Sequence, residues 1–162
     1  MVIISAEKLK EFYFYCPNTG IFTRKKPILN FNIGDISGSK DGRGYLRMSI
    51  DNQRYWAHRL AWLYMTGEYP NDAIDHIDGN KSNNSFNNLR LANKSQNGCN
   101  RSKPSNNTSG IKNIRFCNQR NKWIAQVQFK GKNYARRFNN LDDAQKHTIE
   151  LRQKLHGEFA HA

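Results

Sequence analysis

The residues best suited to chemistry lie in one short stretch, residues 74–97. Asp75 and His76 end an apolar run and precede a glycine–asparagine turn. A return strand is expected at about 88–91 and a helix from about Ser95. An acid beside a histidine is common by chance, but a strand, turn, strand and helix in this order form a ββα unit. Such a unit can bring a carboxylate, an imidazole and two amides together at one cation.

The surrounding residues 71–100 are polar and rich in asparagine. One interpretation is a plain surface loop. Loops of this length without secondary structure are uncommon in compact domains, however, and often carry function. The composition therefore favours a functional segment over a simple connection.

The charge balance points to a polyanionic partner. The chain has 162 residues with 26 Lys+Arg against 13 Asp+Glu, a formal charge of +13. Residues 101–140 contain ten Lys or Arg and no acid, interleaved with aromatic residues such as Trp123 and Tyr134. A solvated basic face is the alternative, but the aromatic residues allow this segment to fold, so nucleic acid is the leading partner.

Several classes of protein are disfavoured. No run approaches the roughly 20 apolar residues of a membrane span, and the N-terminal residues do not form a signal peptide. The three cysteines are an odd number, widely spaced and without a C-x-x-C pair, which argues against a disulfide framework or a four-thiolate zinc site. A reducing cytoplasm is expected, and no membrane partner.

The patterns predict an α+β fold. Residues 12–15 and 21–23 read as two strands joined by a turn at 17–20, and residues 45–50 and 53–56 as a second pair joined at Asp51-Asn52. A short helix follows and ends at Gly67. The N-terminal part is therefore predicted to be β-rich.

The C-terminal part is predicted to be a small three-stranded antiparallel sheet with one helix. The strands are expected at 111–116, 122–129 and 133–138. The helix begins after Asn139 or Asn140, with acids in its first turn, and runs to about Gly157. Residues 101–108 are small, polar and basic, as is typical of a linker.

Alternation along these strands assigns the two faces of the sheet. Trp123, Ala125, Val127, Phe129 and Phe138 are expected to cover the helix. Phe138 shares parity with Tyr134, so this assignment requires a bulge near Arg136-Arg137. The open face is then predicted to hold Asn113, Arg115, Lys122, Ile124, Gln126, Gln128, Lys132, Tyr134 and Arg136.

Taken in order, the motifs of the chain resemble those of HNH nucleases of the ββα-metal type. The resemblance is to the phage and intron-associated homing type with a C-terminal AP2-type DNA-binding domain, and it covers nearly the whole chain. Any one motif is weak, but their order is a strong signal. The motifs are YCPNTGIF at 15–22, GY at 44–45, AHRLAW at 57–62, GEYP at 67–70, IDHIDGN at 74–80, NLR at 88–90 and Asn97.

The resemblance implies a role for each residue of the candidate site. His76 is the implied general base, a role suited to a side chain that titrates near neutrality. Asn88 is the implied middle asparagine, which orients the imidazole through its side-chain or backbone oxygen. Asp75 and Asn97 are the implied ligands of one divalent cation, Mg²⁺ or Mn²⁺, because oxygen ligands favour hard ions. His58 is expected to be structural.

The resemblance also implies the domains and the partner. A nuclease domain is expected at 1–100, with its ββα-metal core at about 71–100, followed by the linker and an AP2-like domain at 109–162. The sheet would read double-stranded DNA in the major groove, with Arg115 and Arg136 suited to guanine, Gln126 and Gln128 suited to adenine, and lysines suited to phosphates.

One ββα centre would cut one strand per visit, so a monomer would nick DNA and a homodimer could break both strands. If the gene belongs to a phage, the protein acts in the cytoplasm of a bacterial host. The alternative function is a DNA-binding regulator that keeps an HNH-like fold without catalysis.

Overall fold

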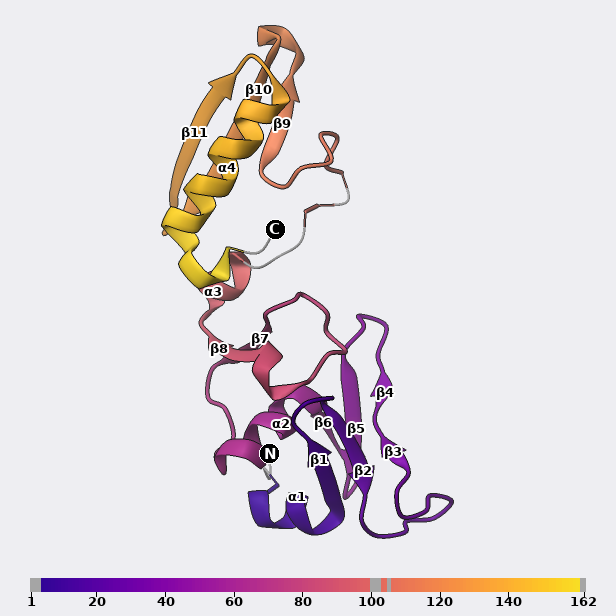
Figure 1. Cartoon of the computed structure of the whole chain (residues 1–162). Coiled ribbons are helices and arrows are strands. Elements are labelled where there is room, and N and C mark those ends of the chain that lie inside the picture. Colours follow the sequence, from indigo (N-terminus) through magenta and orange to yellow (C-terminus); the bar gives the residue numbers. More distant parts are fainter. Residues whose placement is uncertain (1–3, 100–102, 105, 161–162) are drawn as a thin grey trace. The chain divides into compact units, whose positions relative to one another are not determined.

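The structure is a computed structural model of the chain that describes residues 4–99, 103–104 and 106–160 (Figure 1). The chain divides into two compact units, Met1–Asn93 and Lys94–Ala162. Helices and strands are both abundant, which confirms the predicted α+β class.

The first unit begins with a helix that the sequence patterns did not predict. Helix α1 (Ala6–Phe12) is capped by Ser5, whose side chain accepts a hydrogen bond from the Lys8 backbone N–H. Phe12 ends this helix, so strand β1 (Tyr13–Cys16) begins one residue later than expected. The chain then turns at 17–20 into β2 (Ile21–Arg24), and β3 (Ile36–Ser37) completes the sheet in the order β1-β2-β3.

The second sheet of this unit contains β4 (Ser39–Lys40), β5 (Leu46–Ile50) and β6 (Gln53–Trp56). Asp51 and Asn52 both have positive φ, at 50° and 60°, as a two-residue hairpin turn of type I′ requires. Helix α2 (Ala57–Thr66) follows at once and ends at Gly67 in the left-handed conformation. The predicted turn and helix end are both confirmed.

One hydrophobic core joins these elements. It is formed by side chains from α1, both sheets, α2 and the strand pair that follows. The largest fully buried apolar and aromatic members are Leu9, Tyr13, Tyr15, Phe22, Met48 and Leu60. The next strands are therefore anchored to a packed core rather than placed on an open loop.

The segment richest in candidate chemistry is a strand pair closed by a long loop. Strand β7 (Ala73–His76) pairs antiparallel with β8 (Leu89–Ala92), and His76 lies opposite Leu89. The 3₁₀-helix η1 (Phe86–Asn88) leads into β8. The predicted strand, loop and return strand are thus present.

The second unit contains a three-stranded antiparallel sheet in the order β11-β10-β9. Its strands are β9 (Ile114–Cys117), β10 (Lys122–Phe129) and β11 (Lys132–Phe138), and the 3₁₀-helix η2 (Asn118–Arg120) joins the first two. Helix α4 (Leu141–His156) packs on one face (Figure 1) and is followed by η3 (Gly157–Phe159). The Asn140 side chain caps α4 by accepting a hydrogen bond from the Asp143 N–H. Asn140 is one of the two residues that the sequence offered as the cap.

Helix α3 (Lys94–Cys99) belongs to the second unit. The sequence placed this helix in the nuclease core and the domain boundary at 101–108; that boundary stays a prediction. Residues 101, 102 and 105 of the predicted linker lie outside the described residues. Within the described part of the chain, no helix is long and apolar enough to cross a bilayer.

Candidate functional site

His76 lies at the end of β7 in a nearly closed environment. The residue is 4% exposed, and its Nε2 atom is 3.1 Å from Oδ1 of Asn84. The His58 ring approaches the imidazole edge-on, with centroids 5.2 Å apart, and the Tyr45 ring lies at 6.0 Å. The imidazole is therefore fixed on one edge by an amide and packed by two rings.

Burial decides the protonation of both histidines. Desolvation lowers the pKa of His76 below its ordinary value, although the Asn84 hydrogen bond and the charges of Asp78 and Asp75 oppose this shift. Burial also lowers the pKa of His58 to about 3, with His76 and Arg59 adding to the effect. A neutral imidazole is the form that can accept a proton.

Asn88 holds the loop between β7 and β8. Its Oδ1 accepts from the Asp78 N–H at 3.0 Å, and its Nδ2 donates to Asp78 Oδ1 at 2.9 Å and to the Asn83 carbonyl at 2.8 Å. Its backbone carbonyl accepts from the Ile77 N–H at 2.9 Å. The side-chain amide at His76 Nε2 is that of Asn84. That Asn88 orients the imidazole through its side-chain or backbone oxygen stays a prediction.

Asp78 is the other fixed point of this loop. Burial alone would raise the pKa of Asp78, but hydrogen bonds from the Asn83 side chain, the Asn80 N–H and the Asn88 side chain outweigh it, so the pKa lies below its ordinary value. Ser82 and Lys81 tie the loop to the preceding sheet by donating to the carbonyls of Gly44 and Arg43. The loop is thus a bonded structure and not the plain surface loop that its composition also allowed.

Asp75 is buried and paired with Arg90. The two residues are direct partners across β7 and β8, and Arg90 donates to Asp75 Oδ2 from Nε at 3.0 Å and from Nη2 at 2.8 Å. The carboxylate is hard and anionic, so it fits the chemistry of Mg²⁺ or Mn²⁺. A cation at Asp75 would share this carboxylate with the Arg90 guanidinium.

Asn97, the second predicted ligand, is half-buried on α3 in the second unit. The predicted pair Asp75 and Asn97 thus comes from both units, and their meeting at one ion stays a prediction. Among the described residues there is no group of three or more His, Cys, Asp or Glu that could hold a metal. The predicted carboxylate–amide donor set supplies oxygen only, which favours a hard cation over Zn²⁺.

The register of the C-terminal sheet corrects the predicted faces. Pairing of β10 with β11 is continuous from Trp123–Phe138 to Phe129–Lys132, so the bulge that we expected is absent. Directly paired residues share a face, and the ring contacts of Phe129 and Phe138 with His156 and His147 of α4 identify the helix side. Three residues predicted on the open face therefore lie on the helix side: Lys132, Tyr134 and Arg136.

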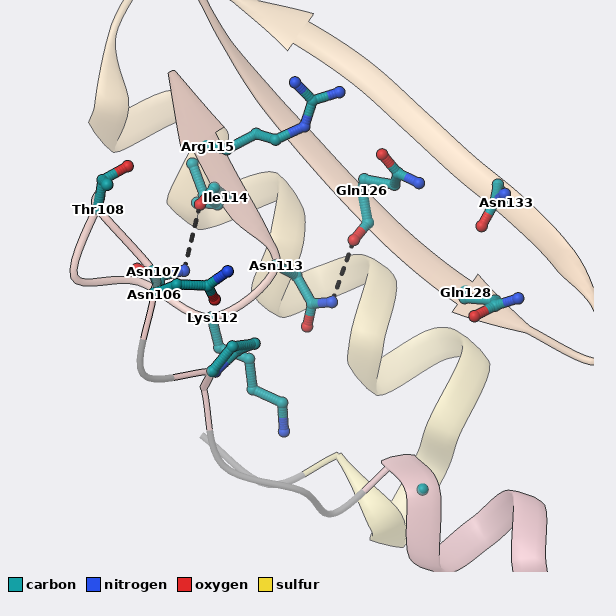
Figure 2. Close-up of a pocket in the computed structure, with 12 residues that line it drawn as sticks. Asn106, Asn107, Thr108, Lys112, Asn113, Ile114, Arg115, Gln126, Gln128 and Asn133 are labelled. Atoms are coloured by element: carbon teal, nitrogen blue, oxygen red, sulfur yellow. Dashed lines mark hydrogen bonds between the residues drawn. The ribbon is translucent and has the colours of Figure 1, made fainter. Parts of the chain in front are cut away.

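The open face carries Arg115, Gln126 and Gln128 as predicted, and it also carries Asn133 and Arg137. Figure 2 shows Arg115, Gln126, Gln128 and Asn133 lining an open cavity of about 540 Å³. The sequence missed Asn133 and Arg137 because the assumed bulge reversed the parity of β11. The signal was present: without a bulge, strict alternation places Phe138 on the helix side and Arg137 opposite.

Two other predicted contact residues make structural bonds in this unit. Asn113 has φ 68°, and its Nδ2 donates to the Gln126 carbonyl at 3.1 Å (Figure 2). Lys122 shares the parity of Gln126, and its ammonium group is hydrogen-bonded to the Asn139 side chain. Asn113 thus fixes the loop that enters β9, and Lys122 lies at the start of β10.

Comparison with known proteins places this site in a family. Residues 55–99 match the family model described as HNH endonuclease. The chain is 36% identical over 104 residues to "Protein 3.8" of Escherichia phage T7, a match that covers 64% of this chain and 86% of that protein. It is 40% identical over 75 residues to "Uncharacterized HNH endonuclease L560" of Acanthamoeba polyphaga mimivirus, covering 45% of this chain and 40% of that protein.

No solved structure matches the chain. The HNH segment begins at Tyr55 in β6 and ends at Cys99 in α3, so it contains Asp75, His76, Asn88 and Asn97. The chain therefore belongs to the family of phage T7 protein 3.8 and carries an HNH endonuclease domain at residues 55–99.

Proposed function

We propose that this protein is a metal-dependent homing-type endonuclease that hydrolyses phosphodiester bonds in double-stranded DNA. The observation that carries the proposal is the pair at the end of β7, a buried carboxylate followed directly by a histidine whose pKa is held below its ordinary value. These are the two groups that hydrolysis needs from the protein, one to hold a cation and one to accept a proton.

In this proposal His76 takes a proton from a water molecule as the water oxygen attacks the scissile phosphorus. The bond to the 3′ oxygen breaks, the leaving oxygen takes a proton from solvent water, and the products are a 3′ hydroxyl and a 5′ phosphate. Asp75 and Asn97 would hold one Mg²⁺ or Mn²⁺, which when bound would neutralise charge that develops on the phosphate. Asn88 keeps the loop after His76 in place through its bonds to Asp78 and Asn83.

The C-terminal sheet supplies the DNA contact in this proposal. An AP2-like sheet inserts its open face into the major groove, where Arg115 and Arg137 suit guanine and Gln126 and Gln128 suit adenine. Lys122 at the start of β10 suits a phosphate, as do Lys132 and Arg136 at the edge strand. The formal charge of +13 supports a polyanionic partner.

A plasmid assay tests the proposal. The native chain with Mg²⁺ is expected to convert supercoiled plasmid to the nicked form, because one active site cuts one strand per visit, and EDTA is expected to stop the reaction. Asp75→Asn and His76→Ala are each expected to lower kcat by about 10²-fold or more. Cleavage by His76→Ala at the native rate would refute the assignment of the base.

The alternative, a DNA-binding regulator without catalysis, makes a different prediction. It binds DNA but cleaves no substrate with Mg²⁺ or with Mn²⁺. Binding without cleavage on plasmid, phage and host DNA would support the regulator. Mapping the ends of any cleaved DNA would identify the recognised site.

A further inference from the structure

We infer that Asn84 is the positioning residue of His76, and that the β1–β2 hairpin holds Asn84 in place for this task. The inference rests on the proposed function, in which His76 is the base. It adds a residue that neither the motifs nor the comparisons assign, and it names the ring nitrogen that takes the proton.

The hydrogen bond between the two side chains fixes the tautomer of His76. A side-chain amide oxygen can only accept a hydrogen bond. Because Asn84 Oδ1 lies 3.1 Å from His76 Nε2, the neutral ring carries its hydrogen on Nε2. The lone pair then resides on Nδ1, which is the atom that accepts the proton from water.

Packing keeps the ring in this orientation. The His58 ring meets His76 edge-on at an interplanar angle of 78°, and the Tyr45 ring is tilted by 53°. A turn of the imidazole about its own axis would remove Nε2 from the amide oxygen and leave that oxygen buried without its donor. A buried acceptor that loses its donor destabilises the turned orientation.

Asn84 is itself held by a distant part of the chain. It is fully buried, and its backbone carbonyl accepts from the Tyr15 hydroxyl at 2.7 Å. Phe86, the first residue of η1, donates its N–H to the Pro17 carbonyl at 2.8 Å. Both partners belong to the β1–β2 hairpin, nearly seventy residues earlier in the sequence.

Gly20 shows how close this contact is. A Cβ placed on Gly20 would lie 2.2 Å from the carbonyl carbon of Asn84 and 2.3 Å from the Ser85 nitrogen. Gly20 also has φ +74°, which favours glycine. The hairpin turn therefore touches the backbone of the residue that orients His76, with no space for a side chain between them.

A purely structural asparagine would be expected to use both ends of its amide. Here Nδ2 of Asn84 is buried and has no hydrogen-bond partner within the described residues. An unsatisfied buried donor opposes folding. The native state tolerates the unpaired Nδ2 donor while Oδ1 contacts His76. This is expected of an asparagine whose oxygen has the functional contact.

Matched variants separate positioning from packing. Asn84→Leu removes the acceptor at similar volume, Asn84→Asp keeps an acceptor oxygen, and Asn87→Leu changes an exposed asparagine of the same loop as the control. We expect Asn84→Leu to lower kcat for plasmid nicking at least 10-fold with KM changed less than about 2-fold. Asn84→Asp should keep most of kcat, and Asn87→Leu should match the native protein.

The tautomer provides a readout that does not depend on cleavage. The full chain with ¹⁵N-labelled histidine should give a pyrrole-type Nε2 and a pyridine-type Nδ1 signal for His76 at neutral pH, with His76→Gln identifying the signals. Hydrogen on Nδ1 in the native protein, or an unchanged kcat in folded Asn84→Leu, would overturn the inference. If Asn84→Leu fails to fold, the native spectrum and a retained Nε2–H in Asn84→Asp decide the question.

The two hypotheses can fail separately. A native protein that nicks DNA with hydrogen on Nδ1 keeps the proposed function and loses this inference. A native protein that never cleaves DNA loses the proposed function, and the inference about the base falls with it whatever the tautomer. An Nε2–H tautomer together with the kcat loss in Asn84→Leu supports both.

Discussion

Arg90 donates two hydrogen bonds to one carboxylate oxygen of Asp75, from Nε at 3.0 Å and from Nη2 at 2.8 Å. The side chains are 14% and 5% exposed, so this is a buried ion pair between two neighbouring strands. The pair fixes the position of the predicted metal ligand before any cation binds.

Removing one partner of this pair should destabilise the first unit. Arg90→Met leaves the Asp75 charge buried without its guanidinium, and we expect the free energy of unfolding to fall by about 3 kcal/mol or more. Urea unfolding followed by circular dichroism measures the change. The double variant Arg90→Met with Asp75→Asn should regain part of the loss, because it removes the unpaired charge.

The exposed pair of Lys8 and Asp51 is the matched control. Lys8→Met should leave the unfolding curve almost unchanged, because exposed ion pairs contribute little. An Arg90→Met protein as stable as the native one would contradict the buried pair.

His58 should make stability depend on pH. Its pKa is about 3 in the folded protein against 6.5 as the ordinary value. Above pH 6.5 the ring is neutral in both states; below it the unfolded chain binds a proton that the folded chain does not. Stability should therefore fall as the pH drops from 6.5 toward 3, with a contribution from His58 of up to about 1.4 kcal/mol per pH unit.

The measurement is urea unfolding at several pH values between 7 and 4. His58→Phe, which has no ionisable ring, should show a shallower loss of stability than the native protein. Equal slopes in the native protein and His58→Phe would show that His58 does not titrate as described.

Gly20 and Gly34 offer a matched test of the contact between the hairpin and the Asn84 backbone. Both have positive φ, but a Cβ on Gly34 meets nothing within 4 Å, whereas one on Gly20 meets the backbone of Asn84 and Ser85. Gly34→Ala should cost about 1 kcal/mol of backbone strain. Gly20→Ala should cost clearly more and reduce nicking together with stability.

Thermal unfolding and the nicking assay measure these two variants side by side. Equal melting temperatures for Gly20→Ala and Gly34→Ala would show that the hairpin and the loop are not in the close contact described.

The corrected register of β11 can be tested by DNA binding. Arg137 lies on the open face and Arg136 on the helix side. If the open face enters the major groove, Arg137→Ala should weaken binding to the cleaved sequence by about 1–3 kcal/mol and change binding to unrelated DNA less. Arg136→Ala should weaken both sequences similarly and reduce the salt dependence.

Fluorescence anisotropy at two salt concentrations gives both quantities. If sequence preference is lost in Arg136→Ala and kept in Arg137→Ala, the side of the sheet that contacts the bases is the one that carries Arg136.

Local signals explain which elements could be predicted. The turn at Asp51-Asn52 and the end of α2 at Gly67 depend on backbone conformations that few residues adopt, so composition reveals them. The strand pair around His76 was predicted because turn residues separate two short apolar runs. Helix α1 was missed because its last residue, Phe12, and the strand residues that follow it, Tyr13 to Tyr15, have strong strand preference.

The candidate site was predictable only where a rare residue marks it. His76 and Asp75 stand out in an asparagine-rich segment, but Asn84 is one of many asparagines, and only the tertiary contact with Tyr15 distinguishes it. The face of β11 depended on a single assumption about a bulge, and one added residue reverses every side chain beyond it. Such long-range and parity effects are absent from local composition.

The bonds from Tyr15 and Pro17 to residues 84–86, and from Lys81 and Ser82 to residues 43–44, bear on how small a working fragment can be. All four contacts cross the start of the family-matched segment at residue 55. A peptide cut to residues 55–99 would lose these partners, and it would also lose the core side chains that precede residue 55, among them Tyr15, Phe22 and Met48. The segment that the family model matches is thus shorter than the unit that folds cooperatively. A truncated protein should lose the folded site before the truncation reaches residue 55.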